Sequence, residues 1–163
     1  MPDLIHNHLL SLLVFLPVLG MVILLFLKDS QTAAIRGVSF VVCAIEALLT
    51  IYLYAGYFPD TAAFQFVERF DWISSFHVEY YVGVDGLSVL LLLLTGLLSF
   101  IALFSALPIK KGVKGFHILY LLLVTGMMGV FVALALFLFY VFWEVMLLPM
   151  YFLLGVLGGP RCE

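Results

Sequence analysis

Residues Leu136–Gly155 read LFLFYVFWEVMLLPMYFLLG, an apolar run with one carboxylate, Glu144, and one proline, Pro149. As a helix, the run is long enough to cross the ~30 Å hydrocarbon core of a bilayer. A charge near the bilayer centre costs at least ~2.5–3.5 kcal/mol, so a carboxylate in such a run indicates a functional site. We therefore expect the rest of the chain to hold this helix in a membrane.

The composition of the whole chain agrees with a membrane location. Of the 163 residues, 66% are hydrophobic and 10% are charged, whereas soluble domains have about 45–50% and about 25%. The sequence therefore predicts an all-α polytopic membrane protein. No Lys or Arg precedes the first apolar run, which argues against a cleaved signal peptide.

Apolar stretches predict five transmembrane helices, at residues 4–27, 33–57, 84–107, 114–132 and 135–157. One helix in place of the last two would be roughly 60 Å long, about twice the hydrocarbon thickness. The chain is therefore expected to fold back near Ala133–Ala135, although no polar cap or helix breaker stands there. The aromatic segment 59–83 fits a short hairpin on the outer surface with a turn near Ser74–Ser75, or alternatively an irregular loop.

The basic residues predict the orientation of the chain. With five spans, six of the seven Lys and Arg residues fall on one side of the membrane, and Arg69 falls on the other. Cytoplasmic loops carry the Lys and Arg excess, so the N-terminus is expected outside and the C-terminus in the cytoplasm. The six basic residues on the cytoplasmic side are Lys28, Arg36, Lys110, Lys111, Lys114 and Arg161.

Glu144 has polar neighbours on its own helix. At about 100° per residue, Tyr140 and Tyr151 share its face. Pro149 has no N–H, which would leave the carbonyl of Val145 free beside the carboxylate. These groups could hold water, and a desolvated carboxyl next to water is what a proton relay requires. The alternative is a neutral Glu144 that only hydrogen-bonds a neighbouring helix.

A second carboxylate, Glu46, lies near the middle of the second predicted helix. Ser39, Thr50 and Tyr57 lie within about 40° of it around the helix, and Cys43 is close by. Such a stripe should face protein or water rather than lipid. We favour a polar contact to another helix or subunit, and a second protonation site is the alternative.

Asp85 and His117 are weaker candidates. Asp85 opens the third helix within GVDGLS, where its side chain is expected to cap free N–H groups. His117 lies one turn into the fourth helix beside lysines, as a proton donor or acceptor or, alternatively, as a solvated interfacial residue. The other histidines, His6, His8 and His77, are not clustered, so no metal site is expected.

Three segments carry a resemblance to a known family: YVGVDGLSVLLLLLTGLL (81–98), GFHILYLLL (115–123) and the run 136–155. Together they resemble the antiporter-like membrane subunits of respiratory complex I, the proton-pumping NADH:quinone oxidoreductase, and in particular chain M, called subunit 4 in mitochondria. The resemblance covers essentially the whole chain. Related subunits occur in Mrp-type multisubunit cation/proton antiporters and in membrane-bound hydrogenases, which stay as alternatives.

The resemblance implies a role in proton translocation coupled to electron transfer. Glu144 would pair with a lysine on the seventh helix and modulate that lysine's pKa. The chain would carry no cofactor or redox site of its own, because NADH, FMN, the iron–sulfur clusters and quinone would bind elsewhere in the complex. Its partners would be the lipid bilayer and the other membrane-arm subunits, with no nucleic acid. The membrane would be the bacterial inner membrane, or alternatively the mitochondrial inner membrane.

The resemblance also implies that residues 1–163 form a single membrane domain, the N-terminal part of a longer subunit of about fourteen helices. The partner lysine would then lie outside this chain. Two features depart from the family pattern. Glu46 matches no known relay residue, and Ala133-Leu134-Ala135 stands where many relatives have a polar residue.

Overall fold

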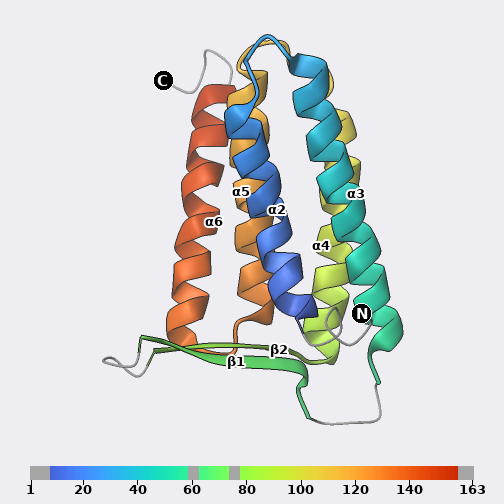
Figure 1. Cartoon of the computed structure of the whole chain (residues 1–163), viewed down its shortest axis with the longest axis vertical. Helices are drawn as coiled ribbons and strands as arrows, with labels where there is room; N and C mark the ends of the chain where they lie inside the picture. Colours follow the sequence, from blue (N-terminus) through green and yellow to red (C-terminus); the bar gives the residue numbers. More distant parts are fainter. Residues whose placement is uncertain (1–7, 59–62, 74–77, 158–163) are drawn as a thin grey trace.

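The computed structural model describes residues 8–58, 63–73 and 78–157. In these residues, five helices run along an elongated bundle, and a two-stranded sheet lies across one end (Figure 1). All five are long and apolar enough to span a membrane, which confirms the predicted helical membrane fold. The helices are α2 (Leu9–Phe26), α3 (Thr32–Gly56), α4 (Gly86–Ser105), α5 (Val113–Val132) and α6 (Leu136–Leu157). Residues 4–7, the expected start of the first span, lie outside the described residues.

The segment between α3 and α4 forms an antiparallel hairpin, so the hairpin prediction is confirmed over the irregular loop. Strand β1 (Gln65–Ile73) pairs with β2 (Val78–Val84), with Phe70 opposite Tyr80. The turn expected near Ser74–Ser75 lies outside the described residues. The hairpin crosses the end of the bundle where α2 begins and where α5 leads into α6 (Figure 1).

Strand β2 fixes the turn between α5 and α6. The Leu134 N–H donates to the carbonyl of Tyr81 at 2.9 Å, and the Ala135 N–H donates to the same carbonyl at 3.4 Å. Val82 forms a bridge with Ala133. Backbone donors beside a helix start need partners outside the helix, and the strand carbonyl provides one here. The chain can therefore turn near Ala133–Ala135, as predicted, without a polar side chain that caps α6.

Glu68 joins the hairpin to α2. Its Oε1 accepts the N–H groups of Leu10 at 3.0 Å and Ser11 at 3.2 Å, and the Ser11 hydroxyl donates to its Oε2. The N-cap residue, His8, makes no side-chain capping bond. The Glu68 carboxylate thus pairs two free amides, and its charge meets the positive end of the helix dipole.

Glycines bring neighbouring helices close together. A Cβ on Gly126 of α5 would lie 2.8 Å from the backbone of Met146 on α6, and a Cβ on Gly96 of α4 would lie 2.5 Å from Thr50 Oγ1 on α3. Small residues at such positions let helix backbones approach within a membrane, where van der Waals packing drives association. The α5–α6 contact positions the helix that carries Glu144.

The two ends of the bundle differ in charge, as predicted. The loops 27–31 and 106–112 lie at the end opposite the hairpin (Figure 1). Lys114 Nζ at that end donates to the carbonyl of Leu27 at 2.8 Å and lies 3.5 Å from Asp29 Oδ1. Arg69 lies in β1 at the hairpin end. Arg161 is outside the described residues, and which end faces the cytoplasm stays a prediction.

Candidate functional site

Glu144 lies on a face of α6 that the described helices do not cover. The helix buries Leu138, Phe142 and Pro149. Glu144 is exposed, and so are Tyr140 and Tyr151, at 58% and 76%. Because α6 is one helix from Leu136 to Leu157, the spacing of Tyr140, Glu144 and Tyr151 places them on one face, as predicted. Pro149 lies on the packed side of this helix.

The exposed carboxylate needs a partner in a membrane. No hydrogen bond or ion pair joins Glu144 to another described residue. A charged group in contact with lipid is costly, and intramembrane carboxylates accordingly face a bundle interior, a water-filled cavity or a cation. The free face of α6 is therefore the place where a further polar or cationic group would dock.

The second carboxylate, Glu46, is enclosed within the bundle. It is 0% exposed, and neither Oε1 nor Oε2 has a hydrogen-bond partner among the described residues. Of the predicted stripe, Ser39, Cys43 and Thr50 are also fully buried, and Tyr57 at the helix end is half-buried. Because Glu46 is buried by this chain's own helices, it does not offer a contact to another subunit.

Polar groups from two more helices lie near the Glu46 stripe. The Tyr120 hydroxyl on α5 donates to the carbonyl of Ser99 on α4 at 2.6 Å. The Cys43 thiol contacts the Ser99 side chain, and Cys43 lies one turn before Glu46. The sequence pattern had not indicated Tyr120 or Ser99 as site residues. One feature of the sequence could have indicated Tyr120: it follows His117 by three residues and therefore lies on a similar face of α5.

His117 is buried, at 2% exposure, so the prediction of a solvated interfacial residue is wrong. Its Nδ1 lies 2.8 Å from the carbonyl of Val113, one turn earlier. The cation nearby is Arg36 of α3, whose Nη2 donates to the carbonyl of Ile109 at 2.8 Å. Packing of α5 within the bundle removes His117 from solvent, which the position of the residue near a helix end did not reveal.

Asp85 caps α4 as predicted. Its Oδ1 accepts the Ser88 N–H at 2.7 Å, and this bond holds the pKa of the carboxyl below its ordinary value. His8 lies 3.8 Å from Glu68 Oε2, at the start of α2. His6 and His77 lie outside the described residues.

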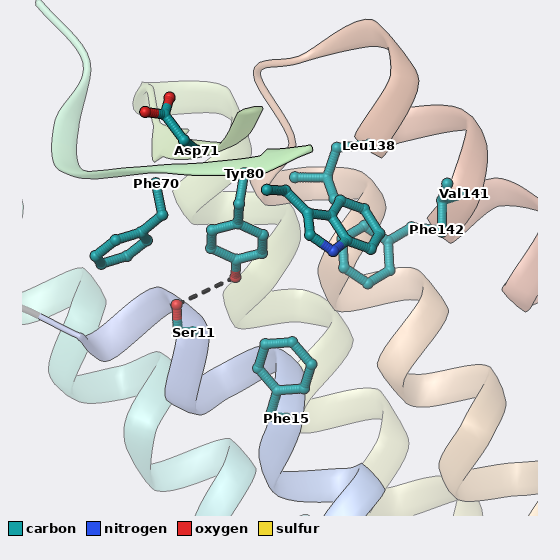
Figure 2. Close-up of a pocket in the computed structure, with 9 residues that line it drawn as sticks. Ser11, Phe15, Phe70, Asp71, Tyr80, Leu138, Val141 and Phe142 are labelled. Atoms are coloured by element: carbon teal, nitrogen blue, oxygen red, sulfur yellow. Dashed lines mark hydrogen bonds between the residues drawn. The ribbon is translucent and has the colours of Figure 1, made fainter. Parts of the chain in front are cut away.

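An apolar pocket of about 530 Å³ opens between α2, the hairpin and α6 (Figure 2). The Tyr80 hydroxyl points from β2 toward α2, where it lies within hydrogen-bond distance of the Ser11 hydroxyl, at 3.1 Å. Burial raises the pKa of Tyr80. The other side chains that line the pocket are aromatic or aliphatic, apart from Asp71. This mainly apolar lining indicates a hydrophobic contact at the pocket.

Comparison with known proteins gives relatives along nearly the whole chain. NAD(P)H-quinone oxidoreductase chain 4 from the chloroplast of Daucus carota is 37% identical, over 93% of this chain and 31% of its own length. NADH-quinone oxidoreductase subunit M of Rickettsia conorii is 35% identical, over 93% of this chain and 32% of its own length. The chain thus spans about a third of the length of these relatives. No protein-family model matches the chain.

A solved structure shares the fold. It is the structure of the membrane-bound sulfane sulfur reductase, an archaeal respiratory membrane complex, in which one chain superposes with a TM-score of 0.71 at 17% identity. The match covers 90% of this chain and 23% of the other. Over 93% of its length, the present chain is homologous to chain 4 and subunit M of the quinone oxidoreductases, which confirms the family resemblance predicted from residues 81–98, 115–123 and 136–155.

Proposed function

We propose that this chain is part of the proton-translocating membrane arm of an NADH:quinone oxidoreductase, and that Glu144 is its proton-relay carboxylate. The observation that carries the proposal is the position of Glu144 on the uncovered face of α6, in a chain homologous to subunit M. The relatives are named as parts of an oxidoreductase. The present chain contributes transport rather than redox chemistry, because the proposal locates NADH, FMN, the iron–sulfur clusters and quinone in other subunits.

The chemistry of Glu144 follows from its surroundings. A cation that docks on the free face favours the ionised carboxylate, and its withdrawal favours the protonated form. Movement of a positive charge toward and away from Glu144 would therefore load and release a proton. Tyr140 and Tyr151 on the same face offer hydroxyl groups that can orient water beside the carboxylate. The partner cation is proposed to come from a helix beyond residue 163.

The membrane and the orientation belong to the same proposal. The end with Lys28, Lys110 and Lys111 faces the cytoplasm, because cytoplasmic loops carry the Lys and Arg excess. The hairpin then lies at the outer surface, where Trp72 and Tyr80 suit the membrane interface. The membrane is a bacterial inner membrane in this proposal, with the mitochondrial inner membrane as the alternative.

A second candidate function is that of a subunit in a Mrp-type cation/proton antiporter or a membrane-bound hydrogenase. This alternative is supported by the fold shared with a chain of the archaeal sulfane sulfur reductase. That complex is named for a reaction other than NADH:quinone reduction, so the fold also occurs in other respiratory membrane complexes. Glu144 would serve proton transfer in either assembly. The two candidates differ in the redox partners that accompany the chain.

The test is purification of the tagged protein from its native membrane in mild detergent. We expect NADH:quinone reductase activity to co-purify, together with the absorption of flavin and iron–sulfur clusters. Membrane partners without a redox spectrum would support the antiporter instead, and an iron–sulfur spectrum with hydrogenase activity would support the hydrogenase. A chain that purifies alone would contradict both candidates.

A further inference from the structure

The Glu46 carboxyl group is the buried titratable group that the proposed function leaves unexplained. It is 0% exposed, and both of its oxygens lack a hydrogen-bond partner among the described residues. Buried polar side chains are in general hydrogen-bonded to protein or to ordered water. The groups around Glu46 therefore indicate whether its carboxyl group is ionised or protonated.

The hydroxyl groups around Glu46 have used their donor hydrogens elsewhere. Thr50 donates to the carbonyl of Ala47 at 2.9 Å, and Ser99 donates to the carbonyl of Gly96 at 2.9 Å. The Tyr120 hydroxyl likewise donates to the Ser99 carbonyl. Each of these oxygens keeps lone pairs that can accept a hydrogen bond. An ionised carboxylate only accepts, whereas a protonated carboxylic acid donates, so these neighbours suit the acid.

Among the described residues, no cation pairs with Glu46 to stabilise its ionised form. Its own helix contributes Cys43 as the titratable neighbour, and α5 contributes Tyr120 and His117. Lys114, at the start of α5, bonds the carbonyl of Leu27 at the basic end. Neither α2, from Leu9 to Phe26, nor α4, from Gly86 to Ser105, contains a titratable residue. Arg36 stands ten residues earlier on α3, roughly 15 Å along the helix axis. Since an unpaired buried charge is very costly, the neutral acid is favoured on charge as well.

The polar groups also form a line from Glu46 toward the basic end of the bundle. Cys43 lies one turn from Glu46 and contacts the Ser99 side chain, and Tyr120 bonds the Ser99 carbonyl. His117 lies one turn before Tyr120 on α5, nearer the basic end, and is close to Arg36. Buried polar groups thus extend from Glu46 toward the end of the bundle that bears the lysines.

We propose that Glu46 is a proton-binding site inside the bundle, which holds its proton as a carboxylic acid and exchanges it with the basic end along Cys43, Tyr120 and His117. The exchange is a proton transfer without redox change: a proton from water at the basic end adds to a Glu46 oxygen, and the same proton leaves by the reverse step. The site goes beyond the proposed function, because it depends on this chain's residues and not on the partner of Glu144.

The test is infrared difference spectroscopy of the protein in its native assembly, which reports the carbonyl stretch of protonated carboxylic acids. At neutral pH, we expect a band that is lost in Glu46→Gln, shifted in Glu46→Asp and kept in Glu144→Gln. The Glu46→Asp variant retains a carboxyl group, so it checks the assignment if Glu46→Gln assembles poorly. Absence of the band from the parent protein, or its survival in Glu46→Gln, would overturn the proposal.

The route of exchange is tested by transfer into deuterated buffer. We expect the Glu46 band to shift on deuteration, and to shift severalfold more slowly in Tyr120→Phe, which lacks the phenolic hydroxyl. A band that does not exchange, or one that exchanges at the parent rate in Tyr120→Phe, would overturn the proposed route. If Glu144→Gln transports protons normally while the Glu46 band behaves as expected, the proposed function fails and the Glu46 site stands.

Discussion

The backbone N–H of Leu134 donates to the carbonyl of Tyr81 at 2.9 Å, and this bond ties the turn before α6 to the hairpin. The residues are 53 positions apart in the sequence. The bond sets where α6 begins, and therefore the height and direction at which the helix presents Glu144. The hairpin thus acts as a brace for the helix that carries the candidate site.

Replacement of Leu134 by proline tests this brace. Proline has no N–H, so the bond to Tyr81 is lost at a cost of about 0.5–1.5 kcal/mol. Ala133 already has the extended conformation that a following proline requires, with φ −69° and ψ 120°. We expect a lower unfolding temperature in detergent, measured by circular dichroism. The matched control is Leu136→Pro, because the first position of a helix tolerates proline. Equal losses in the two variants would show that the Tyr81 bond does not brace the turn.

Replacement of Glu68 tests the cap on α2. Glu68→Ala removes the acceptor of two backbone amides, and we expect a loss of about 1–2 kcal/mol in the free energy of unfolding. Glu68→Gln keeps an acceptor oxygen without the charge, so its loss should be smaller. Glu79→Ala is the control in the same hairpin, since Glu79 pairs with Arg69 on an exposed surface and such pairs contribute little. A Glu79→Ala loss as large as that of Glu68→Ala would contradict the capping role.

Replacement of Gly126 tests the close approach of α5 and α6. In Gly126→Ala, the new Cβ would meet the backbone of Met146 at 2.8 Å, and a backbone cannot turn aside as a side chain can. We expect a loss of about 1–3 kcal/mol from overpacking. Gly115→Ala on the same helix is the control, because its Cβ would meet nothing within 4 Å. Unfolding of both variants in a denaturant series measures the difference, and a neutral Gly126→Ala would refute the packing.

The helices could be predicted from the sequence because each is an apolar run of membrane-spanning length. The shared face of Glu144, Tyr140 and Tyr151 followed from helical periodicity alone. Glu68 could not be found in this way, because its partners at Leu10 and Ser11 are 58 and 57 residues away. Burial of His117 was also missed, since it depends on how α5 packs against the other helices. Periodicity gives the face of one helix, and the packing of helices decides what that face meets.

The pH dependence of the α4 cap follows from the lowered pKa of Asp85. Its ionised form accepts the Ser88 N–H in the folded state. A carboxyl whose pKa is lowered by folding stabilises the fold above its ordinary pKa of 3.8, and this contribution is lost as the pH falls through the folded value. We therefore expect the parent protein to lose stability below pH ~4 relative to Asp85→Asn, which caps without titrating. A constant difference between the two proteins across this pH range would contradict this role.

The most direct test of the account is proton transport by the assembled complex with Glu144→Gln. Glutamine keeps the shape and the hydrogen-bonding capacity of the side chain but cannot bind and release a proton. The measurement is proton uptake into vesicles per quinone reduced, with Glu144→Asp as the variant that retains a carboxyl group. We predict that Glu144→Gln loses most or all coupled transport and that Glu144→Asp retains part of it. Parental transport by an assembled Glu144→Gln complex would contradict the account, because ionisation at this position would then have no part in the mechanism.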